Sequence, residues 1–281
     1  MTNRADPPQQ ENALVITSAA NPAVKALKSL EKKKGRREQN AFLAEGARLI
    51  SEAMAHDWTP VTLVCGPDGA TRTTNMELIE ATQAQGARLL MVNNRLLGSI
   101  ARKENPQTLL ATFQPRYRLL KDLSPETLED GSYVALYQVR DPGNLGTILR
   151  TSDFAGVKGV ILIGDCCDLY SLETVRASMG SLFAMPVYFA TEEEFTDWQK
   201  GSGLTMVAAS MNGTTPHHTA DYGERSLILM GNEQSGLPPH IEAQCDVLSR
   251  IPMREGADSL NLGIATALMI YAALGTRGYS I

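Results

Sequence analysis

The second half of the chain alternates short apolar runs with helix-like stretches, and this alternation limits the possible folds more than any other feature. Val160 to Ile163 is an uninterrupted apolar run of the kind found in buried parallel strands, and a helix is expected before it, at Leu145 to Gly156. Further strands are expected at Tyr133 to Val139, Thr205 to Ala209 and Ser226 to Met230. Strands that alternate with helices predict a mostly parallel sheet with helices packed against it.

The first half shows the same alternation between Leu14 and Phe113. Asn21 followed by Pro22 is typical of a helix start, and apolar residues then recur at helical spacing. We therefore expect a second, smaller α/β domain, also with a mostly parallel sheet. The expected organisation is a flexible tail at 1–12, the smaller domain at 13–115, a charged, proline-containing linker at 116–130 and the larger domain at 131–281.

Composition favours a folded protein without membrane contact. Apolar residues make up 43% of the 281 residues, and no apolar run approaches the roughly 20 residues needed to cross a bilayer. The polar start of the chain lacks a signal-peptide-like stretch, so we expect a cytoplasmic protein. Neither the histidines nor the cysteines have metal-ligand spacing, and no metal is expected. The cysteines, which also lack a disulfide pattern, are Cys65, Cys166, Cys167 and Cys245.

Basic residues gather in one stretch of an otherwise acidic chain. The formal net charge is −5, yet seven basic residues and one acidic residue, Glu31, lie between Asn21 and Arg37. A local positive patch of this kind can bind RNA phosphates while the rest of the surface does not. A solvated helix end would have the same composition, so charge alone leaves both interpretations open. The candidate RNA-binding residues are Lys25, Lys28, Lys32, Lys33, Lys34, Arg36 and Arg37.

Three polar loop segments in the second half follow expected strands, where α/β folds place their ligand sites. They run from Val139 to Arg150, from Met230 to Leu237 and from Ile251 to Leu262. Together they offer small residues for close backbone approach and Asn, Arg, Glu and Ser side chains. The glycine-rich dinucleotide fingerprint, the phosphate-binding loop and the nucleophile elbow are absent from the sequence. Such segments suit recognition of a bound cofactor and a phosphate-bearing substrate.

In order and spacing, these segments resemble the three motifs of the SpoU (TrmH-like) family of RNA 2′-O-ribose methyltransferases, within the SPOUT superfamily. The first half is similar to the family's ribosomal-protein-like α/β substrate-binding domain through Asn21-Pro22, the basic stretch and Phe42 to Gly46. The resemblance implies an α/β trefoil-knot domain that binds S-adenosylmethionine. It also implies a homodimer formed through knot helices, for which the apolar helix after Asn261 is the candidate. The implied substrate is RNA, with ribosomal RNA favoured over tRNA.

The resemblance also implies roles for individual residues. Arg150 is expected to activate the ribose hydroxyl, either by stabilising the alkoxide as a cation or by being deprotonated when RNA is bound. Glu233 is expected to hold Arg150 or a neighbouring loop, and a bulky side chain at Gly231 is expected to block the cofactor pocket. The implied catalytic residues are Asn144, Arg150, Glu233, Ser259 and Asn261, and the implied cofactor-binding residues are Ser210, Met230, Gly231, Asn232, Ile251, Met253 and Leu260.

Plainer interpretations remain open for several of these residues. Arg150 could form an ordinary salt bridge on a helix face, Asn144 could be a turn residue leading into that helix, and Ser259 could be the N-cap of the last helix. Two other functional classes are also open: a non-catalytic RNA-binding protein of ribosome assembly with the same fold, and a nucleotide-dependent oxidoreductase. The missing glycine fingerprint weighs against the second.

Overall fold

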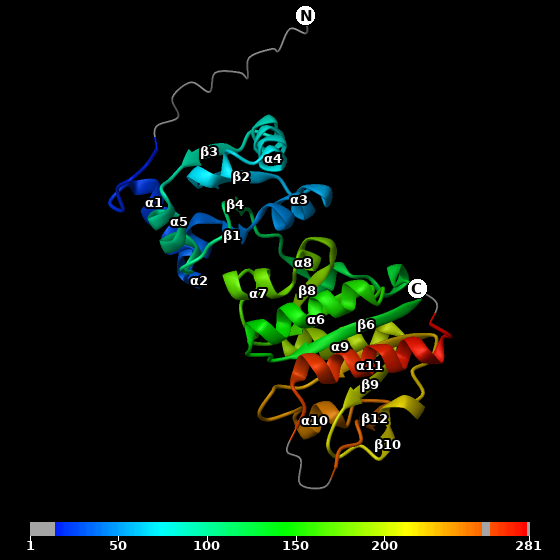
Figure 1. Ribbon diagram of the computed structural model, residues 1–281. Helices are drawn as coiled ribbons and strands as arrows, with labels where there is room; N and C mark the ends of the chain where they lie inside the picture. The colour runs from blue at the N-terminus through cyan, green and yellow to red at the C-terminus, as the bar shows by residue number, and fades with distance from the viewer. Residues whose placement is uncertain (1–14, 255–258, 280–281) are drawn as a thin grey trace, which may run out of the picture. The chain divides into compact units, whose positions relative to one another are not determined.

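The computed structural model describes residues 15–254 and 259–279, which form two compact units divided between Gln114 and Pro115. Each unit combines one sheet with helices, which confirms the α/β class expected from the sequence (Figure 1). The expected tail at 1–12 lies outside the described residues.

The first unit contains a four-stranded sheet in the order β1-β4-β2-β3. The expectation of a mostly parallel sheet is wrong for this unit. β4 (Leu109–Phe113) returns between β1 (Phe42–Glu45) and β2 (Pro60–Cys65) and pairs antiparallel with both. β2 and β3 (Arg88–Met91) form the parallel pair. Alternating strands and helices do not by themselves set the direction of a strand that inserts later between two others.

The basic stretch of this unit forms two short helices, α1 (Pro22–Ser29) and α2 (Lys33–Gln39). α1 begins as the sequence predicts, because Asn21 Oδ1 accepts a hydrogen bond from the Ala23 N–H at 2.9 Å and Pro22 opens the helix. The remaining helices are α3 (Ala47–Ala55), α4 (Thr73–Ala84) and α5 (Asn94–Ala101), with a short 3-10 turn, η1 (Pro67–Gly69).

The second unit contains an eight-stranded sheet in the order β10-β12-β9-β11-β6-β7-β8-β5, with parallel pairing throughout the described residues. This confirms the expected parallel sheet and puts the carboxyl ends of its strands at one edge. From β6 the chain adds β7 and β8 on one side and then crosses to the other, so the strand order switches there. The strands are β5 (Arg118–Leu119), β6 (Gly131–Tyr137), β7 (Gly159–Ile163), β8 (Val187–Ala190), β9 (Thr205–Ala209), β10 (Thr215–Pro216), β11 (Arg225–Met230) and β12 (Val247–Arg250).

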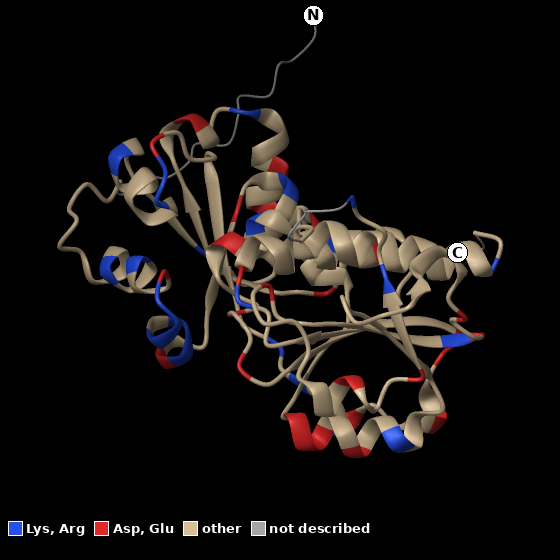
Figure 2. Ribbon diagram, turned by 90° about the horizontal axis from the view of Figure 1, so that it is seen from below, with Lys and Arg blue, Asp and Glu red and all other residues tan. Residues whose placement is uncertain are grey.

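Helices cover both faces of this sheet (Figures 1 and 2). One face packs its apolar side chains, Tyr133 and Ile161 among them, against Phe195 and Ile241 from two helices of that side. The other face carries two long helices, one that begins within the first polar segment and one that begins at the end of the third. The helices are α6 (Pro142–Phe154), α7 (Leu172–Ala177), α8 (Ser181–Ala184), α9 (Glu192–Ser202), α10 (Pro239–Glu242) and α11 (Leu262–Thr276), and His217–Thr219 forms the 3-10 turn η4.

Residues 116–130, expected as a linker, pack as part of the second unit. Arg118 and Leu119 form β5 at the sheet edge, followed by the 3-10 turns η2 (Leu120–Asp122) and η3 (Pro125–Thr127). Leucines at every third to fifth position of this segment enter the core below β6: Leu120, Leu123 and Leu128, with exposures of 1%, 7% and 8%. The charged residues between these leucines make the segment resemble a solvated linker in the sequence.

Helix boundaries near the polar segments differ from the expected ones. α6 begins at Pro142 with Asp141 as its N-cap, so Asn144 lies in the first helical turn and not in a turn before the helix. α11 is capped by Asn261, whose Oδ1 accepts a hydrogen bond from the Ile264 N–H at 3.2 Å, and the N-cap interpretation of Ser259 is wrong. In both places the cap is the residue whose oxygen can reach the open N–H groups.

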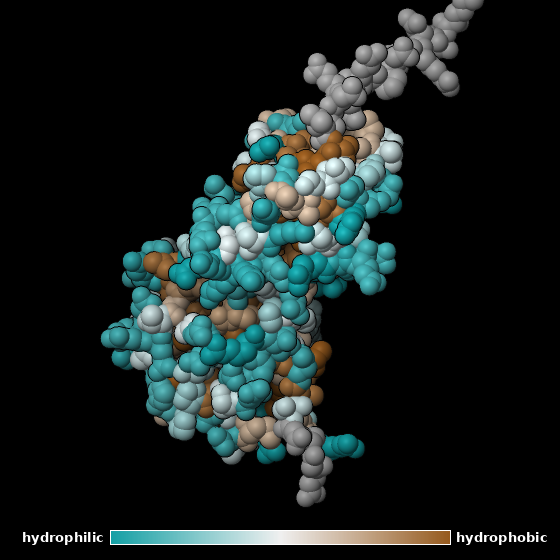
Figure 3. All heavy atoms as spheres, turned by 90° about the vertical axis from the view of Figure 1, so that its left-hand side faces the viewer, coloured by the Kyte–Doolittle hydropathy of each residue, from teal (hydrophilic) through white to brown (hydrophobic). Residues whose placement is uncertain are grey.

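No helix in the described part of the chain is long and apolar enough to cross a membrane. On the face drawn in Figure 3, hydrophilic residues predominate and hydrophobic residues show only in patches. Exposed large hydrophobic side chains lie on α11 and at β5.

Candidate active site

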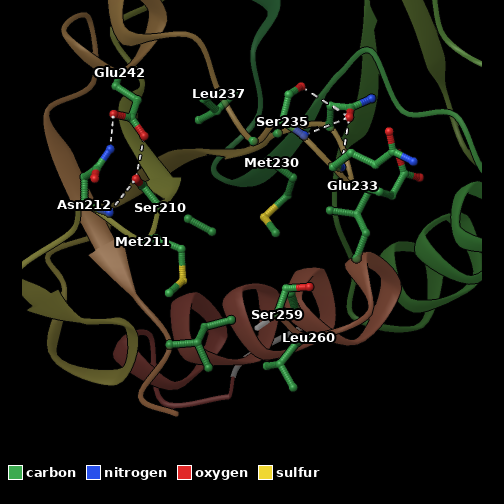
Figure 4. Close-up of a pocket in the computed structure, with 18 of the residues that line it drawn as sticks. Ser210, Met211, Asn212, Met230, Glu233, Ser235, Leu237, Glu242, Ser259 and Leu260 are labelled. Carbon is green, nitrogen blue, oxygen red and sulfur yellow. Dashed lines mark hydrogen bonds between the residues drawn. The ribbon is translucent and has the colours of Figure 1, made fainter. Parts of the chain in front are cut away.

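The second and third polar segments line one pocket at the carboxyl ends of β9, β11 and β12 (Figure 4), and the first segment contributes no residue to its lining. The pocket has a volume of about 480 Å³, within the range of small-molecule sites. All seven residues implied as cofactor-binding lie in its lining, as do Glu233 and Ser259. The lining consists of Ala209, Ser210, Met211, Asn212, Met230, Gly231, Asn232, Glu233, Gln234, Ser235, Gly236, Leu237, Glu242, Ile251, Met253, Ser259, Leu260, Leu262 and Ala265.

A chain of side-chain hydrogen bonds joins the three segments beside this pocket. Asn144 Nδ2 donates to Glu233 Oε1 at 3.2 Å, and Asn261 Nδ2 donates to Asn144 Oδ1 at 2.8 Å. Asn144 is 9% exposed and comes from α6, while Glu233 follows β11 and Asn261 caps α11. The structure thus brings together three of the five residues implied as catalytic, although they are far apart in sequence.

The Glu233 carboxylate sets the orientation of both amides in this chain. An ionised carboxylate only accepts hydrogen bonds, so Asn144 must turn its NH₂ group toward Glu233 and its oxygen toward Asn261. Asn261 must then present its own NH₂ group and keep its oxygen for the helix cap. One N–H on each amide is left for a ligand, and both amide planes are fixed before a ligand arrives.

The backbone before α6 also holds Glu233. The N–H groups of Arg140 and Asp141 donate to its two oxygens at 3.0 and 3.1 Å. Burial alone would raise the pKa of the Glu233 carboxyl, but these bonds and the Asn144 amide outweigh it and lower the pKa below its ordinary value. Of the roles expected for Glu233, the structure favours holding a loop, because its partners lie at residues 140–144.

Replacing Glu233 with glutamine should lower the methyl transfer that the sequence resemblance implies about 100-fold, because the amide cannot accept both backbone N–H bonds and the site loses its alignment. Because the pKa of Glu233 is lowered in the folded protein, its carboxylate stabilises the fold at pH values above the ordinary carboxyl pKa of about 4.3. This stabilisation is lost as the pH falls through the lowered pKa. The melting temperatures of wild type and variant should therefore differ more at pH 7 than at an acidic pH below the lowered pKa. An equal difference at both pH values would contradict this role.

Gly231 allows the backbone of its own loop to pack closely, and this requirement excludes a side chain there. A Cβ atom built on it would lie 2.4 Å from the Gly236 carbonyl carbon and 2.7 Å from the Leu237 nitrogen. Asn232 closes the same loop through reciprocal backbone hydrogen bonds with Gly236 at 3.0 Å, and its Nδ2 donates to the Gln138 carbonyl at 2.8 Å. The sequence suggested that a side chain at Gly231 would fill the pocket. The structure shows instead that it would collide with the backbone of Gly236 and Leu237 and disrupt the loop.

Arg150 stands apart from this cluster. It lies on α6, is exposed, and is absent from the pocket lining. Its guanidinium carbon is 5.7 Å from the centroid of the Phe154 ring, one helical turn away. Among the described residues, neither a hydrogen bond nor an ion pair joins Arg150 to Glu233 or Asn144.

Sequence reasoning missed a second polar group at the opposite side of the pocket, seen in Figure 4 around Glu242. The Glu242 carboxylate, from α10, accepts hydrogen bonds from Ser210 Oγ at 2.5 Å and from Asn212 Nδ2 at 3.0 Å. Within the described residues, Glu242 forms no ion pair. Only Ser210 was expected at this site, and the glutamate carries no local sequence signal because a helix outside the three segments delivers it.

The basic stretch remains a candidate RNA surface with one exception. Arg36 is 6% exposed and its Nη1 donates to the carbonyls of Leu30 and Glu31, both at 2.7 Å, so it closes the turn between α1 and α2. The RNA-binding prediction is wrong for Arg36, because a buried guanidinium cannot reach a phosphate. Lys25, Lys32, Lys33, Lys34 and Arg37 are exposed, and Lys28 is partly exposed.

Comparison with known proteins shows the family of the chain. Residues 131–271 match the SpoU rRNA Methylase family, and residues 21–111 match the MRM3-like substrate binding domain. The chain therefore belongs to the SpoU rRNA methylase family, which confirms the resemblance drawn from the three polar segments.

Relatives and solved structures of this family match nearly the whole chain. The chain is similar to the S-adenosylmethionine-bound rRNA methyltransferase of Sinorhizobium meliloti, with a TM-score of 0.86, 43% identity, and coverage of 94% of this chain and 98% of that one. It is 28% identical to the 23S rRNA (guanosine(2553)-2'-O)-methyltransferase RlmP of Bacillus subtilis, over 92% of this chain and 99% of the relative. It also matches the cofactor-bound SpoU methyltransferase AviRb of Streptomyces viridochromogenes, with a TM-score of 0.83, 27% identity, and coverage of 93% and 100%.

Proposed function

We propose that this protein transfers a methyl group from S-adenosylmethionine to a ribose 2′-hydroxyl of RNA, with ribosomal RNA as substrate. The observation that carries the proposal is the hydrogen-bonded chain Glu233–Asn144–Asn261, which joins the three family segments and reaches the pocket wall through Glu233. The name of RlmP specifies 2′-O-methyl transfer to 23S rRNA, and that of the Sinorhizobium meliloti protein specifies rRNA methyl transfer, so both support the proposed reaction and substrate.

The pocket residues fit S-adenosylmethionine. Met230, Leu237, Ile251 and Leu260 offer apolar walls for an adenine ring, while polar side chains gather at two opposite sides. Glu242 keeps lone pairs that can accept donors from the cofactor, either ribose hydroxyls or the ammonium group. When bound, S-adenosylmethionine supplies a methyl group already activated for in-line transfer.

The protein then has to orient the acceptor and help its hydroxyl lose a proton. The remaining N–H groups of Asn144 and Asn261 are fixed donors for an oxygen of the substrate ribose or phosphate. Glu233 is a poor proton acceptor because its lowered pKa reflects hydrogen bonds that it would have to give up. We assign the activation of the hydroxyl to Arg150, with Ser259 at the pocket wall as a neighbouring contact.

The Glu242 assignment makes a binding prediction. Glu242→Gln should weaken S-adenosylmethionine binding about 10-fold, because hydrogen bonds to a charged acceptor are lost or weakened. Calorimetry with S-adenosylmethionine and with 5′-methylthioadenosine, which lacks the amino acid, would show whether ribose or ammonium is held. Glu193→Gln, at an exposed position on α9, is the matched control. Unchanged affinity for both ligands would rule out the contact.

Helix α11 supports a homodimer. It is apolar around its whole circumference, which is typical of a buried helix, yet Ile264, Leu268 and Tyr271 are 53%, 38% and 45% exposed. These residues, four and three positions apart, form one stripe along the helix, called here the α11 stripe. Phe154, on the helix α6 that packs against α11, is 60% exposed. We propose that a second copy covers this surface and that Arg150 acts there.

We also propose that the second unit is knotted, that the first unit binds RNA phosphates and that the protein is cytoplasmic. Ile251, Met253, Ser259 and Leu260, described residues between β12 and α11, line the pocket together with the loop after β11, which supports the trefoil knot of the family. The exposed lysines of α1 and α2, with Arg37, form the proposed phosphate-binding surface of the substrate-binding unit. We place the protein in the cytoplasm, where its proposed substrate is found.

Methyl transfer to RNA tests the proposal directly. Purified protein should move labelled methyl from S-adenosylmethionine into large ribosomal RNA, and nuclease digestion should release the label as a 2′-O-methylnucleoside. The same product in tRNA alone would keep the reaction and change the substrate. Cofactor binding without transfer to rRNA, ribosomal subunits or tRNA would favour a non-catalytic role in ribosome assembly.

A further inference from the structure

The edge strand β5 follows an exposed aromatic side chain that two others support. Tyr117 directly precedes β5 and is 57% exposed. Its ring centroid lies 5.5 Å from that of Tyr170, edge to face, and 5.5 Å from that of Phe189. A tyrosine held against two rings in this way offers a rigid flat surface at low cost in conformational entropy.

The backbone beneath this ring is also fixed. Tyr170 is 3% exposed, and its hydroxyl accepts a hydrogen bond from the Arg116 N–H at 2.9 Å and donates to the Arg116 carbonyl. Parallel pairing of Arg118 and Leu119 with β8 holds the other side. Tyr117 therefore stands between two anchored residues of the sheet edge.

Basic residues precede and follow Tyr117 in the sequence. Arg116 and Arg118 are exposed, and Lys121 follows in the same segment. Aromatic faces between basic residues are the usual means of binding single-stranded nucleic acid, since bases stack on the ring and phosphates meet the cations. This arrangement lies in the second unit, separate in sequence from the lysines of α1 and α2.

A cavity of about 470 Å³ opens at the carboxyl ends of β7 and β8, and Phe189, which contacts the Tyr117 ring, forms part of its wall. Leu119, Leu162 and Phe189 form its apolar walls, and its carboxylates, Asp165 among them, disfavour a phosphate inside. Arg140 connects Asp165 to the proposed active site. Its Nη1 lies 2.7 Å from Asp165 Oδ2, and its backbone N–H donates a hydrogen bond to Glu233. The cavity and the site thus share one connecting residue along the same sheet edge.

We propose that Tyr117, Arg116 and Arg118 form a second RNA contact, which binds single-stranded nucleotides that flank the methylated one. One base stacks on Tyr117, a neighbouring base enters the apolar cavity, and the arginines bind the phosphates between them. This inference rests on the proposed function, because it requires the RNA to lie across the Glu233 segment.

Two variants of the full chain test the contact. Tyr117→Ala should raise the KM for ribosomal RNA and the Kd for a short fluorescent single-stranded RNA about 10-fold, as loss of one stacked base does. The kcat and the affinity for S-adenosylmethionine should stay unchanged, and Tyr117→Phe should behave as wild type. Arg118→Gln should reduce the slope of log Kd against log salt by about 0.7, the contribution of one phosphate on a single strand. Tyr279→Ala, at a tyrosine that is 65% exposed elsewhere in the unit, is the matched control.

Equal RNA affinities for wild type, Tyr117→Ala and Arg118→Gln would overturn the contact and leave the edge of β5 to a protein partner. Failure of the proposed function would look different, because wild type itself would then transfer no methyl group to RNA. The fluorescence measurement needs no methyl transfer, so it decides the contact in either case. An equal loss in Tyr117→Ala and the Tyr279→Ala control would likewise count against the contact.

Discussion

Replacing Arg150 with alanine is expected to lower methyl transfer about 1,000-fold, because proton abstraction or charge stabilisation by a positioned side chain commonly contributes about 10² to 10⁴ in rate. Arg150 is exposed and only flanks the Phe154 ring, so its removal should leave the melting temperature unchanged. It lies outside the cofactor pocket, so affinity for S-adenosylmethionine should also be retained.

The lysine variant and a surface control refine this test. Arg150→Lys keeps one positive charge but loses the planar guanidinium, so it should recover only part of the rate. Arg250→Ala, at an exposed arginine at the end of β12, should be neutral for turnover. Near wild-type turnover of both Arg150→Ala and Arg150→Lys would remove Arg150 from the mechanism and leave the Asn144–Asn261 donors as the remaining candidates.

Placing a charge on the α11 stripe is expected to abolish both the proposed dimer and the activity. Leu268 is the middle residue of the stripe, and Leu268→Asp would bury a carboxylate without a partner if a second copy covers it, at a cost of several kcal/mol. The dimer dissociation constant should rise more than about 100-fold, since each 1.4 kcal/mol corresponds to tenfold. Light scattering after size exclusion would show a monomer near 30.5 kDa.

Leu268→Ala is the matched control, because it shortens the side chain without adding charge and should remain a dimer at high concentration. Leu268→Asp should still bind S-adenosylmethionine if the pocket of one subunit is complete. It should lose methyl transfer, because the second copy would no longer cover the surface on which Arg150 acts. A Leu268→Asp protein that stays dimeric and active would place the dimer interface elsewhere and leave the exposed stripe unexplained.

The sequence determined the fold class of the second unit and the content of its pocket. Uninterrupted apolar runs such as Val160 to Ile163 predict buried parallel strands, and these were found in β7. Every residue expected around the cofactor lines one pocket, because these residues follow β9, β11 and β12, parallel strands that end at the same edge. Periodicity and segment order are local properties, and they can be read without knowing the packing.

Tertiary structure decided the features that depend on distant partners. Nothing near Arg36 in the sequence distinguishes it from Arg37, yet one closes a turn and the other stays exposed. The antiparallel insertion of β4, the docking of β5 and the delivery of Glu242 by α10 all depend on which elements meet in space. The same holds for the amides of Asn144 and Asn261, which only the distant Glu233 carboxylate orients. A hydrogen bond between distant residues forms when folding buries both, so the local pattern around either residue cannot specify it.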